Sequence, residues 1–362
     1  KKINPVPPMS PAAAPHPKSA SRYSSGPRTG SNARRSTAPT ICETTTTPMA
    51  WWRFDAMPPR KSAAPYVTAE RMANVTNTGE GYPLSSDRLP VLTFLDSFSM
   101  THPFFSVHPT AFSHRGGRLL WPENTVFAFQ QSYDLGYRYF ETDLHLTKDG
   151  VVVLLHDDYL DRTTDGTGDV WEYTFEELES FDAAFRFGAD REWPYRGQGI
   201  TIPTLEEIVT TFPDIRLTLE LKQSGLEGPL VALLERLDLW DRVIIGGFDD
   251  RWSRAVRKAS GGRVLTSSGV WETRAFWLAS RAGVGLRLPA AALQVPVRHG
   301  NLTIVDDKFV GAAHRADKQV HVWTVNEADE MHRLLDLGVD GLMSDRPDVL
   351  KAVHEERGVA LA

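Results

Sequence analysis

Charged side chains interrupt an otherwise apolar stretch of the sequence, residues 137–168, which reads YRYFETDLHLTKDGVVVLLHDDYLDRTTDGTG. Glu141 and Asp143 alternate with apolar neighbours in its first half, and His156 and Asp157 follow the second apolar run. Burying a charged group in a strand is costly unless a partner or a ligand compensates for it. The pattern therefore predicts either a solvent-exposed face or a functional site.

The same stretch predicts two strands that are joined by a tight turn. The dipeptide Asp149-Gly150 favours a two-residue hairpin turn, and with this turn Asp143 faces His156. If the turn begins one residue earlier, Glu141 faces His156 instead. In either register, we expect the imidazole at the level of the two carboxylates.

A third carboxylate, Glu220, lies on a later predicted strand, two residues before Lys222. Residues two apart on a strand point to the same face. Three carboxylates without a nearby cysteine form an oxygen-rich set that suits Mg²⁺ or Ca²⁺. We therefore predict that Glu141, Asp143 and Glu220 hold one divalent cation. The alternative is that these acids form ion pairs, of which Glu220 with Lys222 is the obvious one.

Two histidines and two cationic side chains complete the set. His114 ends the first predicted strand and precedes Arg115, while His156 ends the hairpin. Imidazoles titrate near neutral pH and suit general acid and base catalysis. Arg115 and Lys222 are donors that suit a phosphate group. Together these residues predict metal-assisted cleavage of a phosphoester.

The elements that must position these residues form a repeating pattern of strand and helix. Eight units of about 30 residues favour a closed (β/α)8 TIM barrel over an open doubly wound sheet. No glycine-rich nucleotide-binding motif follows the first strand, which removes one reason to prefer the open sheet. In a barrel, functional groups belong at the carboxyl ends of the strands, where the residues above fall. The predicted strands lie at residues 111–116, 137–147, 215–222, 242–248, 263–269, 291–297, 321–326 and 340–345.

The composition excludes several other classes of protein. The net charge is -6, and outside the first 50 residues there are 33 basic against 45 acidic residues, which argues against non-specific nucleic-acid binding. The single cysteine, Cys42, allows no intramolecular disulfide and suits a reducing compartment. No apolar run approaches the ~20 residues of a membrane-spanning helix, and no secretory h-region is visible. We predict a cytoplasmic protein without integral membrane association.

The N-terminal part has a different composition. Up to about Met49 it consists mainly of Pro, Ala, Ser, Thr and Arg, which cannot bury enough apolar surface to fold. We predict that residues 1–105 are disordered or poorly structured and that residues 106–358 form the barrel domain. The segment also resembles an organelle transit peptide. A truncated sequence, or a misassigned start upstream of Met72 or Met100, explains it equally well.

Several motifs together resemble the glycerophosphodiester phosphodiesterase family over about residues 112–353: SHRGG, PENT, ETD, LTKDG, HDDYLDRTTDGTG, IPTLEE, LELK, WTVN and DGLMSDRP. The resemblance implies a (β/α)8 barrel with a small insertion after the second strand, here about residues 157–199. It also implies residue roles: Glu141, Asp143 and Glu220 as metal ligands, His114 and His156 as the acid-base pair, Arg115 and Lys222 as phosphate-binding residues, and Trp323 as part of the pocket. Asn124, Gln294 and Asn326 are candidates for supporting or substrate contacts.

The resemblance further implies a reaction. A glycerophosphodiester, the expected small-molecule partner, is hydrolysed to sn-glycerol 3-phosphate and an alcohol. The glycerol 2-hydroxyl attacks phosphorus, one histidine removes its proton and the other protonates the leaving alcohol, and water then opens the cyclic phosphate. One divalent cation, Mg²⁺ or Ca²⁺, assists. The alternatives are phospholipase D-like or lysophospholipase D-like cleavage of lysolipids on the same barrel, and an inactive barrel used for binding. No oligomeric state is predicted.

Overall fold

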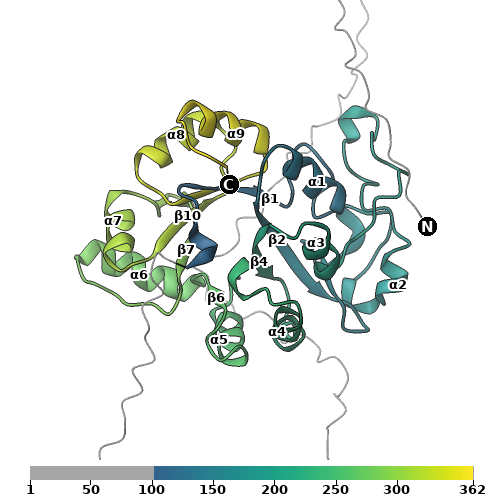
Figure 1. Ribbon diagram of the computed structural model, residues 1–362, viewed down its shortest axis with the longest axis horizontal. Coiled ribbons are helices and arrows are strands. Elements are labelled where there is room, and N and C mark those ends of the chain that lie inside the picture. Colours follow the sequence, from purple (N-terminus) through teal and green to yellow (C-terminus); the bar gives the residue numbers. More distant parts are fainter. Residues whose placement is uncertain (1–101, 362) are drawn as a thin grey trace, which may run out of the picture. The chain divides into compact units, whose positions relative to one another are not determined.

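Eight parallel strands form a barrel in the computed structural model, which describes residues 102–361 (Figure 1). Their alternating side chains face inward to the barrel lumen or outward to the surrounding helices. The strands are β1 (Thr110–His114), β2 (Tyr139–Leu146), β4 (Arg216–Leu221), β5 (Val243–Gly246), β6 (Leu265–Thr266), β7 (Ala292–Pro296), β10 (Gln319–Trp323) and β11 (Gly341–Ser344).

The sheet closes on itself. The strand order is β6-β5-β4-β2-β1-β11-β10-β7, and its two ends meet at a parallel bridge between Ser267 and Ala292. The Ser268 backbone N–H donates to the Ala292 carbonyl at 2.9 Å, and the Ala291 N–H donates to the Thr266 carbonyl at 2.8 Å. The predicted (β/α)8 barrel is therefore confirmed, and the open sheet is excluded.

Helices follow the strands and surround them (Figure 1). The first begins at Val126 rather than at Pro122, because the Thr125 hydroxyl accepts from the Ala128 N–H and caps it. The barrel helices are α1 (Val126–Asp134), α3 (Leu205–Thr211), α4 (Glu227–Arg236), α5 (Asp250–Ala259), α6 (Val270–Ala282), α7 (Asp307–Arg315), α8 (Ala328–Asp336) and α9 (Pro347–Glu356). None of the helices within residues 102–361 combines the length and apolarity that crossing a membrane requires.

Aromatic side chains fill the barrel at the amino ends of its strands. A short 3₁₀ helix, η1 (Pro103–Phe105), packs there, and Phe104 is completely buried. Its ring lies edge-to-face on Tyr139 with centroids 5.7 Å apart, and the Tyr139 hydroxyl donates to its carbonyl at 2.8 Å. Residues 102–105 of the predicted N-terminal segment thus pack against the barrel, and the prediction for residues 1–101 lies outside the described residues.

An additional strand, β3 (Val152–Leu154), pairs antiparallel with the end of β2 and forms the predicted hairpin. Leu144 lies opposite Leu154, so extending this register places Thr142 opposite His156. Both predicted registers, with Asp143 or Glu141 facing His156, are therefore wrong.

The cause is the length of the turn. The Thr147 N–H donates to the Val151 carbonyl at 3.0 Å, which leaves three residues rather than two in the loop. The Thr147 hydroxyl holds this loop by accepting from the Val151 N–H at 2.9 Å and donating to the Asp149 carboxylate at 2.5 Å. Gly150 adopts φ 84°, the left-handed conformation typical of three-residue hairpin loops.

The segment between β3 and α3, which contains the predicted insertion at about residues 157–199, has only short helical turns (teal in Figure 1). These are η2 (Leu160–Arg162), η3 (Val170–Glu172), α2 (Phe175–Leu178) and η4 (Ala189–Arg191). A separate small core supports them, consisting of Val153, Leu155, Leu160, Val170, Leu178, Ala183 and Ile202. The segment therefore packs as a unit beside the hairpin.

Candidate active site

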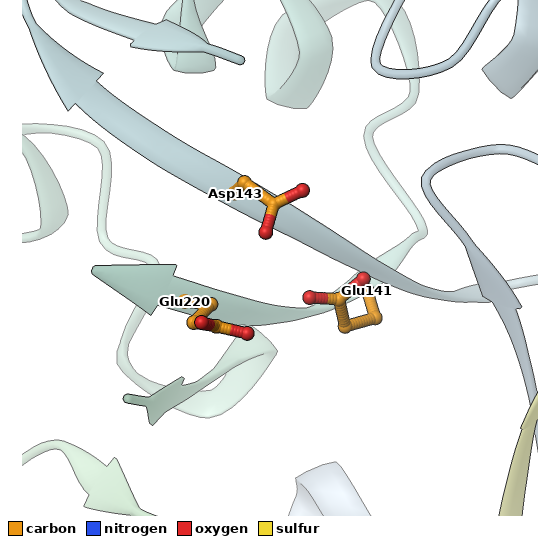
Figure 2. A group of neighbouring side chains, drawn as sticks. All are labelled: Glu141, Asp143 and Glu220. Atoms are coloured by element: carbon orange, nitrogen blue, oxygen red, sulfur yellow. The ribbon is translucent and has the colours of Figure 1, made fainter. Parts of the chain in front are cut away.

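Three carboxylates meet at the carboxyl ends of two neighbouring strands (Figure 2). Glu141 and Asp143 lie on β2, and Glu220 on β4 is paired in register with Asp143. Each offers one oxygen, and the three oxygens lie within 4.8 Å of one another. Asp143 is completely buried and Glu141 is 4% exposed, so water compensates little of their charge. The structure thus brings together the three residues that were predicted to bind a metal ion.

Two cations neutralise part of this cluster. The Lys222 ammonium lies 2.9 Å from Asp143 Oδ1 and 2.6 Å from Glu220 Oε1, so the ion pair considered as the alternative is present. Arg115 Nε lies 2.9 Å from Asp143 Oδ2. Burial alone would raise the pKa of Asp143, but Lys222 and Arg115 hold it well below its usual range. Burial lowers the pKa of Lys222, and the two carboxylates more than offset this, so the net shift is upward.

Glu141 is compensated differently. Among the described residues its Oε2 has no hydrogen-bond partner, and its ion-pair contact is His114 Nε2 at 3.3 Å. Burial, and secondly the charge of Asp143, raise the pKa of Glu141 well above its usual value. A buried oxygen without a donor, beside two further carboxylate oxygens, fits a hard divalent cation. The residues present therefore suit such an ion.

His114, at the end of β1, is held by a carboxylate from the last strand. Its Nδ1 lies 2.5 Å from Asp345 Oδ1. Asp345 in turn accepts from the Asn326 side-chain amide at 3.1 Å and from Arg118 Nε at 2.9 Å. Burial lowers the pKa of His114, and the hydrogen bond to Asp345 partly offsets this. Asn326, predicted as a supporting residue, thus supports the partner of His114.

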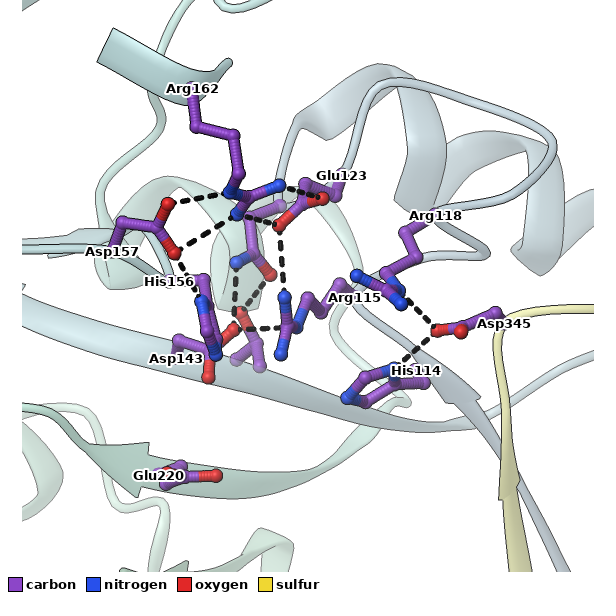
Figure 3. A network of polar contacts seen from close by, with 12 residues as sticks. His114, Arg115, Arg118, Glu123, Asp143, His156, Asp157, Arg162, Glu220 and Asp345 are labelled. Atoms are coloured by element: carbon purple, nitrogen blue, oxygen red, sulfur yellow. Dashed lines mark hydrogen bonds and ion pairs between the residues drawn. The ribbon is translucent and has the colours of Figure 1, made fainter. Parts of the chain in front are cut away.

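His156, just after β3, has an equivalent partner. Its Nδ1 lies 2.5 Å from Asp157 Oδ1, and Arg162 Nε donates to Asp157 Oδ2 at 2.5 Å (Figure 3). Burial would raise the pKa of Asp157, but its hydrogen bonds to His156 and Arg162 keep it low. Figure 3 shows His156 beside Asp143, whereas His114 contacts Glu141. The two imidazoles therefore approach different carboxylates of the cluster.

The loop after β1 supplies further contacts. Arg115 and Asn124 both adopt left-handed backbone conformations, and the Asn124 N–H donates to the Arg115 carbonyl at 3.0 Å. The Asn124 side-chain amide donates to Asp143 Oδ2 at 3.0 Å, and its oxygen accepts from the Thr142 hydroxyl at 2.8 Å. Asn124, predicted as a supporting residue, therefore touches a predicted metal ligand directly.

Three other residues singled out in the sequence have different surroundings. Trp323, at the end of β10, is half-buried and lies edge-to-face on Phe248 with centroids 5.7 Å apart. The Gln294 amide donates to the Thr218 hydroxyl at 3.1 Å within the barrel, and the structure does not bring it to the carboxylates. His145 contacts Gln223 at 2.9 Å and is likewise not part of the cluster.

Sequence reasoning assigned no role to Glu123, Asp157, Arg162 or Asp345, although all of them hold predicted site residues. Asp345 follows the last strand and Asp157 follows His156, so position at a strand end was the available signal. Glu123 and Arg162 lie in loops, where spacing gives no such signal. The fold and the site together define a (β/α)8-barrel enzyme with its functional groups at the carboxyl ends of the strands.

Comparison with known proteins identifies the family. Residues 114–349 match the model of the glycerophosphoryl diester phosphodiesterase family. A Mycobacterium tuberculosis protein named "Probable glycerophosphodiester phosphodiesterase 2" is 36% identical over 256 residues, which cover 68% of this chain and 91% of that protein. A glycerophosphodiester phosphodiesterase of Caldanaerobacter subterraneus is 31% identical, over 66% of this chain and 94% of that protein. The chain belongs to this family and is a phosphoric diester hydrolase, so the predicted resemblance and enzyme class are confirmed.

Solved structures agree with this assignment. An Oleispira antarctica phosphodiesterase, in complex with the product sn-glycerol-3-phosphate, is 26% identical with a TM-score of 0.55, covering 68% of this chain and 97% of that one. The glycerophosphoryl diester phosphodiesterase domain of a Mycobacterium tuberculosis protein is 22% identical with a TM-score of 0.62, covering 69% and 99%. The second likeness supports the fold alone.

Proposed function

We propose that this enzyme hydrolyses glycerophosphodiesters to sn-glycerol 3-phosphate and an alcohol, with Glu141, Asp143 and Glu220 holding one divalent cation, Mg²⁺ or Ca²⁺. The observation that carries the proposal is the meeting of three carboxylate oxygens within 4.8 Å, with His114 in contact with one of the three residues. The product bound to the Oleispira antarctica relative supports the choice of substrate.

The phosphate is bound by the two cations beside the carboxylates. Arg115 and Lys222 each contact Asp143, so a phosphate that reaches this residue meets both donors. When bound, a divalent cation polarises the oxygens that it contacts and lowers the pKa of a hydroxyl group. Trp323, half-buried at the end of β10, contributes an apolar wall to the pocket.

His114 and His156 exchange protons with the substrate. Asp345 and Asp157 engage the Nδ1 atoms, which fixes the tautomers and leaves each Nε2 for the substrate. One imidazole removes the proton of the glycerol 2-hydroxyl as its oxygen attacks phosphorus. The other protonates the oxygen of the departing alcohol. Water then opens the resulting cyclic phosphate, and the two imidazoles exchange roles.

Release of glycerol 3-phosphate from a panel of glycerophosphodiesters, with and without added Mg²⁺ or Ca²⁺, tests this proposal. We expect cation-dependent release from glycerophosphocholine without detergent. Cleavage of lysophosphatidylcholine micelles with no release from glycerophosphocholine would favour the lysophospholipase D-like alternative. A lack of hydrolysis of every compound would favour the inactive barrel. A cytoplasmic location also remains a prediction, which cell fractionation can test.

A further inference from the structure

The Arg162 side chain lies between two carboxylates that come from different loops (Figure 3). Its Nη1 and Nη2 donate to Glu123 Oε2 at 2.8 Å and Oε1 at 2.7 Å. Its Nε and Nη2 donate to Asp157 Oδ2 at 2.5 Å and Oδ1 at 3.2 Å. One planar guanidinium therefore binds both carboxylates through paired hydrogen bonds, the geometry for which arginine is suited.

Each of these carboxylates continues to a residue of the proposed machinery. Glu123 Oε1 accepts from Arg115 Nη1 at 3.0 Å, and Asp157 Oδ1 lies 2.5 Å from His156 Nδ1. Arg115 in turn contacts Asp143. Arg162 thus stands one carboxylate away from a proposed phosphate-binding residue and one carboxylate away from a proposed acid-base residue.

The surroundings favour a strong interaction rather than a loose surface ion pair. The Glu123 side chain is 12% exposed and that of Asp157 is 28% exposed, so water screens them only partly. Burial would raise the pKa of Glu123, but Arg162 and Arg115 lower it to about 2. Without Arg162, Glu123 keeps only Arg115 as an ion-pair partner, and Asp157 keeps only His156. Both carboxylates can then rotate.

We propose that Arg162 is a positioning residue that fixes the orientations of His156 and Arg115 at the same time, through Asp157 and Glu123. The inference rests on the proposed function of these two residues. Because Arg162 lies on η2 in the segment after β3, it also makes the packing of that segment a condition for an ordered site. Arg162 does not itself touch the reacting atoms.

Steady-state kinetics of Arg162→Ala test the proposal. Removing a group that orients a reactive side chain commonly costs about 10- to 100-fold. We expect a loss of that size in kcat/KM, with kcat lowered through His156 and KM raised through Arg115. Asp157→Asn should lower mainly kcat and Glu123→Gln should raise mainly KM, so the two effects separate. Guanidinium ions should partly restore Arg162→Ala, since the Arg162 side chain is 42% exposed and its site is accessible.

A matched control is Arg236→Ala. Arg236 forms a paired interaction with Glu206, at 2.7 and 2.6 Å, between α4 and α3. This variant loses an arginine with the same geometry at a position outside the site. We expect its kcat and KM to stay within twofold of the wild-type values, with no response to guanidinium.

The orientation of His156 can also be followed without turnover. In the wild-type protein, the Nδ1 proton of His156 should give a downfield NMR signal because of its short contact to Asp157. Loss of this signal in folded Arg162→Ala supports the proposal even if glycerophosphodiesters prove not to be the substrate. An unchanged signal, or a kcat/KM within threefold of wild type, overturns it. A loss of activity that matches a lower folded fraction, without guanidinium rescue, also overturns it.

Discussion

A buried histidine in the barrel interior should make the stability of the fold depend on pH. His321 on β10 is completely buried, with Nε2 3.0 Å from Gln319 Oε1 and its ring 4.9 Å from that of Phe112. Burial, and secondly the nearby His108, lower the pKa of His321 from 6.5 to about 3. The folded protein therefore keeps this imidazole neutral at pH values where the unfolded chain protonates it.

The sign and size follow from proton linkage. Between pH 6.5 and about 3 the unfolded state binds one more proton than the folded state at this residue, so the free energy of unfolding falls as pH falls. The slope approaches about 1.4 kcal/mol per pH unit. From pH 7 to pH 5, the contribution integrates to a loss of about 2 kcal/mol. This change is a large fraction of the 5–15 kcal/mol that stabilises a typical domain.

Urea unfolding of the wild-type protein and of His321→Gln at pH 7 and pH 5 measures this term. Glutamine offers a donor and an acceptor of similar reach but does not titrate. The variant should lose about 2 kcal/mol less than the wild type between the two pH values. His332→Gln, at a partly exposed helix position, is the matched control and should follow the wild type.

An equal loss in the wild type and in His321→Gln would refute the reasoning, because it would mean that His321 is protonated in the folded state. The absolute stability of the variant at pH 7 does not affect this test. Only the difference between the two pH values enters the comparison.

Three further predictions concern the site. His114→Ala and His156→Ala should each lower kcat at least ~100-fold with an unchanged circular dichroism spectrum, and near-normal turnover in either would remove the acid-base assignment. Asp345→Asn should lower kcat by a comparable factor while KM changes little, because His114 loses the acceptor that fixes its tautomer; kinetics with glycerophosphocholine measure this. EDTA should abolish activity and added Mg²⁺ or Ca²⁺ should restore it, whereas unaffected rates after dialysis would contradict a metal-dependent reaction.

The meeting of the three carboxylates was predictable because strand geometry alone determines it. Glu141 and Asp143 share a face of β2, and parallel pairing places Glu220 beside Asp143. His114 also followed from its position at the end of β1. In such a barrel, the side-chain period and the strand order leave little freedom at these positions.

The parts that were not predictable depend on loops. Whether the hairpin turn has two or three residues was decided by the Thr147 hydroxyl, and this choice shifted His156 by one position. The partners of Glu123 and His114 lie 39 and 231 residues away, so no local pattern indicates them. Only the folded loops bring these groups within hydrogen-bond distance.

The contact between His114 and Asp345 has a consequence for the synthesis of the protein. β1 pairs with β2 and with β11, so one edge of the first strand stays open until the last strand is made. A ribosome-bound chain that ends before Gly341 lacks both this strand and the carboxylate that orients His114. The first and last segments of the barrel thus complete the site together, and a nascent chain can become an enzyme only at the end of translation.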